Sequence, residues 1–380
     1  MKYYIIAGEA SGDLHGSNLM KGLYAQDPKA DIRFWGGPLM NEVYGQHQEG
    51  DGLVMDYREG AVMGLFAVLL QGRKILERIE ACKQDIRTWQ PDVVILIDYP
   101  GFNLKMAEFA HNAGFKVFYY IAPKVWASRE GRIEKLKAWV DQLFIVFPFE
   151  EPYFRAKGVP YVYAGNPLVD AIESSPALQE SRAAFLQRTG LPDQPWIALL
   201  PGSRSMEIKS MMSIYMKFAD QWHSSHPADI FVIAGAPSRS LKDYPIGRRS
   251  YVKVVFGETY GILRHARAAV VNSGTASLET ALIGTPQVVG YRMSMVPAWL
   301  AHKYVKVKYI SLGNLILDRL AFREFLMNEL TPKALLKEVS LLTEDAAYRQ
   351  KMLADYAEIR TLLGGAGASD KVAKAMIELL

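Results

Sequence analysis

The sequence has little cysteine and no long hydrophobic run, and both shortages narrow the class of protein. Cys82 is the one cysteine among 380 residues. An intramolecular disulfide and a zinc site built from thiolates are therefore excluded, and we expect a reducing compartment. The longest uncharged apolar segment, 61–72, is well short of the roughly 20 residues that span a bilayer. The first eight residues are predicted to form a strand and no signal peptide, because they carry one cation and Glu9 follows directly.

A strong charge of one sign is also absent, as are the motifs of several enzyme classes. The formal net charge of +4, from 44 basic and 40 acidic residues, is too balanced to indicate nucleic acid binding. The seven histidines show no His-Glu-x-x-His or Cys/His spacing, which leaves a catalytic zinc unsupported. There is no P-loop, no Gly-x-Gly-x-x-Gly fingerprint and no Gly-x-Ser-x-Gly elbow. These absences weigh against ATP, NAD and serine-esterase chemistry.

What is present is an ordinary globular composition that alternates strands with helices. The length suggests two domains. Short runs rich in Val, Ile, Phe and Tyr predict strands near 3–7, 31–35, 93–97, 117–121, 143–147, 161–164, 196–200, 230–234, 252–256, 269–272 and 287–290. Turn formers interrupt this rhythm at 174–195. We predict an α/β protein with two Rossmann-like lobes and an active site in the cleft between them.

The predicted domains are 1–172 and 173–344, followed by a helix-patterned tail at 345–380. In a two-lobed protein this tail can pack back on the first lobe, or it can pack on a partner subunit. The spacing of its residues leaves both arrangements open.

In the first half, titratable residues follow two predicted strands. A glycine-rich turn, 8–16, carries Glu9, Asp13 and His15 where a strand meets a helix. Such a turn alone is structural about as often as functional, but three titratable groups favour function. Asp98 follows the buried strand 93–97, where it could act as a general base or could cap the next helix. The spacing of these residues favours neither interpretation over the other.

In the second half, two motifs indicate a phosphate site. Arg204, in the turn 201–207, has the planar fork that grips phosphate, although a loop arginine is more often a solvated surface residue. Residues 272–280 place small side chains before a helix. There Ser273, Gly274 and Thr275 could hold a diphosphate, and Glu279 could bind ribose hydroxyls. The alternative is a Ser/Thr N-cap with a first-turn glutamate.

Two stretches could face outward. Segment 61–70 is apolar nearly all round and has cations on both sides. A buried helix is the plainer interpretation, and an element that enters the membrane interface is the alternative. Residues 280–317 contain no Asp or Glu but hold four cations with one Trp and three Tyr. That composition suits a membrane interface or a phosphorylated amphiphile.

Four motifs taken together resemble the lipid-A-disaccharide synthase family: 8–13, 98–103, 200–204 and 273–279. The resemblance continues almost end to end through 120–127, 147–150, 289–293 and 309–315. Jointly the motifs are highly specific. This chain has Ala-Pro-Lys-Val-Trp-Ala at 122–127 where the family pattern has Ser-Pro-Ser-Val-Trp-Ala, so Lys124 replaces a serine.

The resemblance implies an inverting glycosyltransferase of the GT-B fold. Such an enzyme joins UDP-2,3-diacylglucosamine to 2,3-diacylglucosamine 1-phosphate and releases UDP. The first lobe would bind the acceptor, with Asp98 as the general base and Glu9 and Asp13 as alternatives. The second lobe would bind the UDP-sugar. Its implied site residues are Ser203, Arg204, Ser273, Gly274, Thr275, Glu279 and Asn314. No metal and no other cofactor is expected.

The resemblance also strengthens the membrane interpretation, because both substrates carry acyl chains. We expect peripheral attachment to the cytoplasmic face of the inner membrane of a Gram-negative bacterium, and a homodimer is one oligomeric state open to the chain. The predicted membrane or acyl contacts are Met63, Leu65, Phe66, Val68, Leu69, Leu70, Arg73, Trp299, Lys303 and Lys306. The competing hypotheses are another GT-B enzyme, such as a UDP-sugar 2-epimerase, and a nonenzymatic phospholipid-binding protein.

Overall fold

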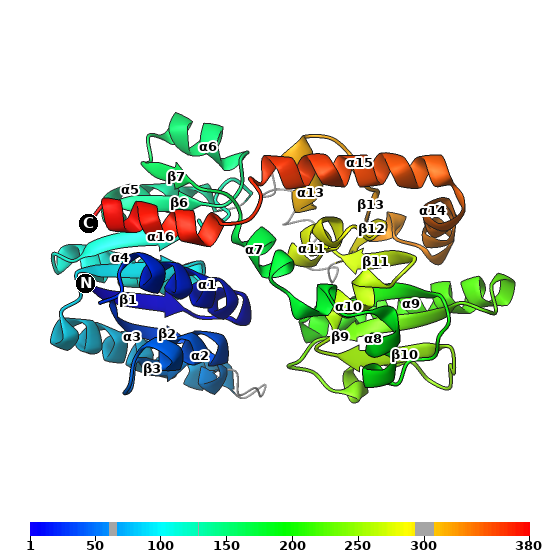
Figure 1. Ribbon diagram of the computed structural model, residues 1–380, viewed down its shortest axis with the longest axis horizontal. Coiled ribbons are helices and arrows are strands. Elements are labelled where there is room, and N and C mark those ends of the chain that lie inside the picture. Colours follow the sequence, from blue (N-terminus) through cyan, green and yellow to red (C-terminus); the bar gives the residue numbers. More distant parts are fainter. Residues whose placement is uncertain (61–66, 128, 293–307) are drawn as a thin grey trace. The chain divides into compact units, whose positions relative to one another are not determined.

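The computed structural model describes residues 1–60, 67–127, 129–292 and 308–380, and the chain forms two compact units (Figure 1). The first unit comprises residues 1–171 and 363–380, and the second comprises 172–362. Segment 61–66 and residues 293–307 lie outside the described residues, as does residue 128.

The first unit is built on a seven-stranded, fully parallel sheet. Its order is β3 (Leu53–Asp56), β2 (Asp31–Gly36), β1 (Lys2–Ala7), β4 (Val93–Ile97), β5 (Lys116–Tyr120), β6 (Gln142–Ile145) and β7 (Tyr161–Tyr163). The helices of this unit are α1 (Ala10–Gln26), α2 (Pro38–His47), α3 (Ala67–Trp89), α4 (Pro100–Asn112), α5 (Ile133–Trp139), α6 (Glu150–Lys157), most of α7 (Pro167–Glu173) and α16 (Ala368–Glu378). Strand β4 is buried throughout, as its unbroken run of Val, Ile and Leu predicts.

The second unit has a six-stranded parallel sheet. Its order is β10 (Val252–Phe256), β9 (Ile230–Gly235), β8 (Trp196–Leu200), β11 (Ala268–Asn272), β12 (Gln287–Tyr291) and β13 (Glu324–Leu326). The helices are α8 (Arg182–Thr189), α9 (Ser205–Ser225), α10 (Thr259–Arg264), α11 (Thr275–Ile283), α13 (Leu312–Leu317), α14 (Pro332–Glu344) and α15 (Ala346–Leu362). The predicted α/β class with two Rossmann-like lobes is confirmed.

Each sheet has one place where the strand order reverses direction. In the first unit this switch point lies between β1 and β4, and in the second it lies between β8 and β11. Ligands of doubly wound sheets bind beyond the carboxyl ends of the strands at such points. All the predicted strands are present. Among the strands of the described residues, sequence analysis missed β3 and β13, which have four and three residues and no buried Val/Ile run.

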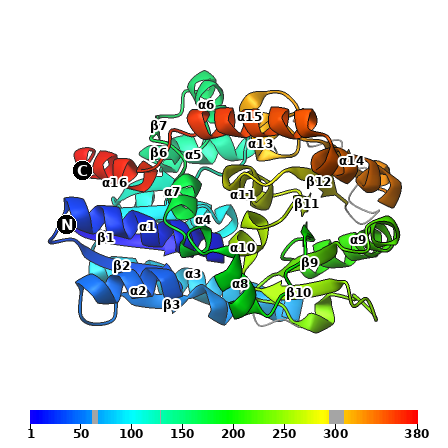
Figure 2. The same cartoon turned by 45° about the vertical axis from the view of Figure 1, so that its right-hand side comes forward.

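The C-terminal tail is divided between the units. Helix α15 belongs to the second unit and packs against α11, α13 and α14, whereas α16 lies along α1 in the first unit (Figures 1 and 2). The Asp170 carboxylate accepts hydrogen bonds from the backbone N–H groups of Gly367 and Ser369 at 2.6 and 2.8 Å, which caps α16. The tail predicted as one segment, 345–380, is thus divided after Leu362, because α15 buries its apolar face against second-unit helices.

Candidate active site

The first switch point brings Glu9 and Asp98 together. Glu9 follows β1 and holds the exposed N-cap position of α1, and Asp98 follows β4, the neighbouring strand. Gly8 lies under the ring of Tyr99, where a Cβ atom would come within 2.3 Å of a ring carbon. Glycine is therefore required at position 8 for the two strand ends to approach each other.

The backbone around Asp98 is strained and firmly held. Asp98 and Tyr99 have φ angles of 43° and 48°, and Ile121, at the end of the adjacent β5, has a φ of 62°. A β-branched residue rarely adopts this left-handed region, and such strain clusters at functional sites. The Asp98 carbonyl oxygen accepts hydrogen bonds from the Asn103 amide at 2.8 Å and the Tyr119 hydroxyl at 2.6 Å. Sequence analysis assigned no role to these two anchoring side chains, although Asn103 closes the motif 98–103.

The Asp98 carboxylate is half-buried between charges of opposite sign. Burial raises its pKa, the Lys124 ammonium lowers it, and the Glu9 carboxylate raises it further. Residue Tyr99 holds the N-cap position of α4. Asp98 therefore does not occupy the N-cap itself, although its carboxylate accepts a hydrogen bond from the Tyr99 backbone N–H, which lowers its pKa. The arrangement can accept a proton from a hydroxyl group that reaches the ends of β1 and β4.

Asp13 has a different environment. It is 1% exposed, and its carboxylate accepts hydrogen bonds from the backbone N–H groups of Gly37, Leu39 and Met40 at 2.9, 3.1 and 3.0 Å. Burial raises its pKa and these three bonds oppose that shift. Asp13 thus caps α2 from α1, so its oxygens are occupied. Burial also lowers the pKa of His15 to about 4, which keeps the imidazole neutral.

Glu150 is a buried carboxylate to which sequence analysis assigned no role beyond its place in the family motif 147–150. It begins α6, is 1% exposed, and accepts a hydrogen bond from the Trp126 indole at 2.9 Å. Burial raises its pKa to about 7, against the opposing effect of its hydrogen bonds and of Lys124. The quoted motif 147–150 was the only sequence signal for this residue, because nothing in the spacing shows that Glu150 meets Trp126.

At the second switch point, the turn after β8 meets the end of β11. Gly202 has a φ of 106°, and a Cβ there would come within 2.4 Å of Glu207 and 2.9 Å of the Asn272 amide. The Glu207 carboxylate shapes the turn by accepting hydrogen bonds from the backbone N–H groups of Ser203 and Arg204 at 3.1 and 3.2 Å. The Arg204 side chain is 75% exposed and lies 3.5 Å from Glu207. Its guanidinium is therefore open to a ligand, as is also true of any solvated arginine.

Helix α11 begins beside that turn. Its N-cap is Gly274, and the Ser273 hydroxyl donates instead to the carbonyl oxygen of Ile310 at 3.2 Å. The alternative of a Ser/Thr N-cap therefore does not apply. Thr275 is exposed at the first turn. Glu279 is half-buried, its pKa is raised by burial, and its Oε1 accepts a hydrogen bond from the Tyr260 hydroxyl at 2.9 Å. Tyr260, unmarked in the sequence, thus orients this carboxylate.

Asn314 lies within the interior of the second unit. Its amide nitrogen donates to the Phe322 carbonyl and to Glu324, and its oxygen accepts from the backbone N–H groups of Ala321 and Phe322. Glu324 in turn accepts hydrogen bonds from the backbone N–H groups of Ile310 and Ser311. The Asn314 amide is fully engaged and 0% exposed, so it supports the segment that receives Ser273. A contact of Asn314 with the UDP-sugar stays a prediction.

The predicted membrane contacts fall where side chains are not described. Six of them lie outside the described residues: Met63, Leu65, Phe66, Trp299, Lys303 and Lys306. The other four lie on the part of α3 whose side chains are not described: Val68, Leu69, Leu70 and Arg73. The next residues of α3, Ile75 and Leu76, are 47% and 59% exposed. Sequence analysis missed these two because Arg73 and Lys74 interrupt the apolar run. No helix among the described residues is long and apolar enough to span a membrane.

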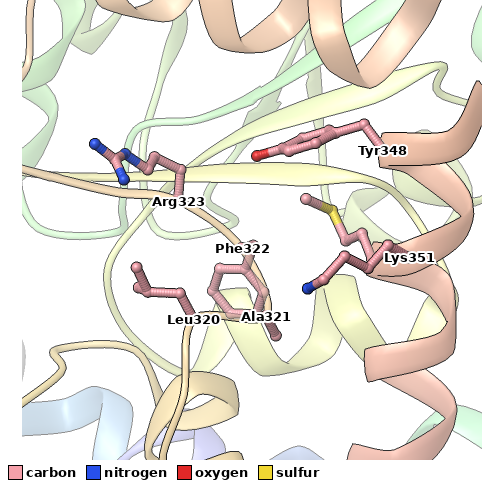
Figure 3. A pocket seen from close by; sticks show the side chains of 7 residues that line it. Leu320, Ala321, Phe322, Arg323, Tyr348 and Lys351 are labelled. Carbon is pink, nitrogen blue, oxygen red and sulfur yellow. The ribbon is translucent and has the colours of Figure 1, made fainter. Parts of the chain in front are cut away.

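A pocket of about 170 Å³ lies elsewhere in the second unit. Figure 3 shows Tyr348 and Lys351 of α15 on one side of it and Leu320, Phe322 and Arg323 on the other. The predicted site residues do not line this pocket. The Lys351 ammonium already pairs with Asp355, and the Tyr348 hydroxyl donates to Glu338. We therefore place the candidate site at the strand ends.

Two doubly wound parallel sheets, each with one switch point, are the architecture of the GT-B fold. The structure is similar to that of a UDP-GlcNAc 2-epimerase from Neisseria meningitidis bound to UDP-GlcNAc. The TM-score is 0.70 at 13% identity, covering 100% of both chains. It is also similar to a UDP-GlcNAc 2-epimerase from Methanocaldococcus jannaschii, with a TM-score of 0.66 at 13% identity over 100% of both chains. These similarities show the fold.

Sequence comparison gives the family within that class. The family model described as lipid-A-disaccharide synthetase matches residues 3–376. The lipid-A-disaccharide synthase of Geobacter metallireducens is 36% identical over 99% of this chain and 96% of its own. The lipid-A-disaccharide synthase of Myxococcus xanthus is 35% identical over 99% of this chain and 97% of its own. The chain belongs to the lipid-A-disaccharide synthetase family and is a glycosyltransferase, which confirms the resemblance predicted from sequence.

Proposed function

We propose that the protein transfers a diacylglucosaminyl group from UDP to the 6-hydroxyl of 2,3-diacylglucosamine 1-phosphate, with inversion. The acceptor oxygen forms a bond to the anomeric carbon while the bond from that carbon to the UDP oxygen breaks. The hydroxyl proton passes to a carboxylate and UDP leaves. The product is a β-1,6-linked disaccharide 1-phosphate. Family membership supports the substrates, and the carboxylate at the first switch point supports the chemistry.

Asp98 is our choice for the base, and its environment is the observation that carries the proposal. Of the three candidate carboxylates, Asp98 is the one that is half-buried, and it lies on a strained backbone near Lys124. Asp13 is committed to capping α2. Glu9 is exposed and acts on Asp98 through its charge. A base with a raised pKa accepts a proton more readily than an ordinary aspartate does.

For the UDP group, we propose the second switch point. The backbone N–H groups of Gly274 and Thr275 at the start of α11 would meet the diphosphate, because helix N-termini stabilise negative charge. Ser273 would contribute through its hydroxyl oxygen, since its backbone N–H already donates to the Gly290 carbonyl oxygen at 3.0 Å. Arg204 and Ser203, across the turn, would carry part of the charge that develops on departing UDP. Glu279, held by Tyr260, would accept hydrogen bonds from ribose hydroxyls.

Attachment to the cytoplasmic face of the inner membrane is part of the proposal. It is supported by the acid-free composition of 280–317 and by the exposed Ile75 and Leu76 on α3. Flotation with vesicles that contain anionic lipid tests it. We expect co-flotation of the protein, and weaker co-flotation of a variant with Ile75→Ser and Leu76→Ser. A homodimer is also proposed, and sedimentation in detergent would measure its mass.

Another GT-B enzyme, such as a UDP-sugar 2-epimerase, is the second candidate; it would share the UDP site but act on a soluble substrate, and a solved epimerase has the same fold. One experiment separates the two. The purified protein is given both diacylated substrates in detergent with a chelator, and UDP release and disaccharide mass are recorded. We expect product from the wild type. Interconversion of UDP-sugars without disaccharide would replace the synthase proposal with the epimerase.

The same assay tests the base. In Asp98→Asn we expect turnover to fall by about 10² to 10⁴-fold, because an amide cannot take the acceptor proton. UDP affinity, measured by calorimetry, should stay within twofold. Asp51→Asn, at an exposed aspartate outside both strand ends, is the control and should turn over as the wild type does. If Asp98→Asn retains wild-type turnover, Asp98 is not the general base and Glu9 becomes the candidate.

A further inference from the structure

Glu150 uses its two carboxylate oxygens for different partners. Its Oε1 accepts the hydrogen bond from the Trp126 indole at 2.9 Å. Its Oε2 accepts hydrogen bonds from the backbone N–H groups of Val146 and Phe147 at 3.2 and 3.1 Å. One oxygen therefore closes the turn between β6 and α6, and the other reaches a different segment of the chain. Capping alone would not require the second oxygen.

Trp126 is held on two sides. Besides the bond to Glu150, its ring packs edge-on against Phe149, with ring centroids 4.9 Å apart. Phe149 in turn stacks on Phe147, with centroids 5.3 Å apart and an interplanar angle of 6°. These contacts hold the indole in place near the end of segment 122–127, whose residues Ala122 and Val125 are buried.

Lys124 is the exposed residue of that segment, and its charge acts on both carboxylates. It lowers the pKa of Asp98 and that of Glu150. Glu9 is the other charged side chain that shifts the pKa of Asp98. In turn, the Asp98 carboxylate raises the pKa of the buried Tyr119, and the Glu150 carboxylate raises that of Tyr163. Lys124 is the cation among these neighbours. Its position relative to Asp98 depends on the segment that Trp126 anchors.

We propose that Glu150 is a positioning residue for the transfer reaction, which fixes segment 122–127 through the Trp126 indole and so keeps Lys124 beside Asp98. The inference rests on the proposed function, since Asp98 is its base. Glu150 is 1% exposed and both of its oxygens are engaged, so its proposed role is exerted through Trp126. Misplacement of a catalytic neighbour by a fraction of an ångström is enough to reduce turnover substantially.

The decisive variant is Glu150→Gln. Glutamine keeps one oxygen for Val146 and Phe147, but it presents an amide NH₂ group to the Trp126 N–H, so the two donors face each other. Trp126→Phe removes the same hydrogen bond from the other side while an aromatic ring remains against Phe149. Trp222→Phe is the matched control, because Trp222 donates to the Asp229 carboxylate at 3.0 Å in a tryptophan–carboxylate pair of the second unit, which is more deeply buried than that of Trp126 and Glu150.

We expect Glu150→Gln to lower kcat by at least about tenfold, with KM for the UDP-sugar within twofold. The acid limb of the kcat pH profile should move to higher pH, because Asp98 loses part of the influence of Lys124. Trp126→Phe should reproduce both changes, and the double variant should be no worse than the poorer single variant. Trp222→Phe should leave kcat and the profile unchanged.

Several outcomes would overturn the proposal. Unchanged kcat in Glu150→Gln would do so, as would multiplicative losses in the double variant, which would show that Glu150 acts independently of Trp126. If Glu150→Gln fails to fold, Trp126→Phe decides alone, and wild-type kinetics in that variant would refute the role. A wild type that forms no disaccharide would refute the proposed function instead, and the positioning role with it.

Discussion

At the scale of single residues, Asp98 is governed by two neighbours of opposite charge. Lys124 favours its carboxylate form, whereas Glu9 and burial favour the protonated form. Since a general base works only when it is ionised, these neighbours set the pH below which activity falls. The family pattern noted above has serine at position 124, so this chain has a cation beside its proposed base.

The neighbours predict shifts of opposite sign. Lys124→Met leaves burial and Glu9 to raise the pKa of Asp98 further, so the acid limb of kcat/KM should move to higher pH. Glu9→Gln removes a repulsive charge, so that limb should move to lower pH. Initial rates of UDP release across the acid range measure both. Shifts of the same sign would contradict the assignment of Asp98 as the titrating group.

Glu150 predicts a pH dependence of stability. Its pKa is about 7 in the folded protein, against an ordinary value of 4.5. The folded state therefore holds a proton that the unfolded state has lost, and stability falls as pH rises from about 4.5 to 7. The loss is on the order of 3 kcal/mol.

In Glu150→Gln this loss should be absent, so the free energy of unfolding of the variant should rise relative to wild type across that interval. Urea unfolding at pH 5 and at pH 7.5 measures the difference. A difference between the two proteins that does not change with pH would show that Glu150 is already ionised at pH 5.

At the scale of helices and strands, Asp13 supports α2 from another helix. Asp13→Ala leaves three backbone N–H groups of α2 without their carboxylate, and we expect a loss of about 2 kcal/mol or more in the free energy of unfolding. Asp13→Asn keeps one oxygen and should lose less. Thermal unfolding by circular dichroism compares the two. If Asp13→Asn retains kcat, Asp13 is excluded as the base.

The element scale also shows what the sequence can and cannot predict. The strands and the placement of Asp98 after β4 follow from hydrophobic runs and their ends. The side chains that hold the site do not. Asn103 of α4 and Tyr119 of β5 both donate to the Asp98 carbonyl oxygen. Tyr260 of α10 donates to Glu279 of α11. These contacts form only when the elements pack together. Asn314 sits in a polar motif, but its buried amide network appears only in the structure.

At the scale of the whole molecule, the chain leaves the first unit after Ala171 and returns to it at Leu363. Helix α16 completes the packing of α1, with Ala368, Val372, Ala373 and Met376 buried. Gly22 of α1 allows this approach, because a Cβ there would lie 2.9 Å from Ala373. The first unit is therefore incomplete without the last residues of the chain.

Truncation after Leu362 should destabilise the first unit selectively. Loss of the four buried apolar side chains of α16 costs on the order of 5 kcal/mol. The second unit keeps all its helices and should unfold as before. Calorimetry should then show the first-unit transition lowered or lost, and hydrogen exchange should show α1 exposed. Equal destabilisation of both units would mean that they fold as one cooperative body.

The meeting of α1 and α16 also affects the order of events during synthesis. Helix α1 is translated well before its partner α16, because the whole second unit lies between them in the chain. At roughly 5–20 residues per second, α1 waits about 20 to 70 seconds with its docking face open. Most of the second unit emerges during that interval, and its last helix, α15, emerges just before α16. The first unit is thus completed only after the second unit has been translated, and a nascent chain stalled before α16 would leave the docking face of α1 uncovered.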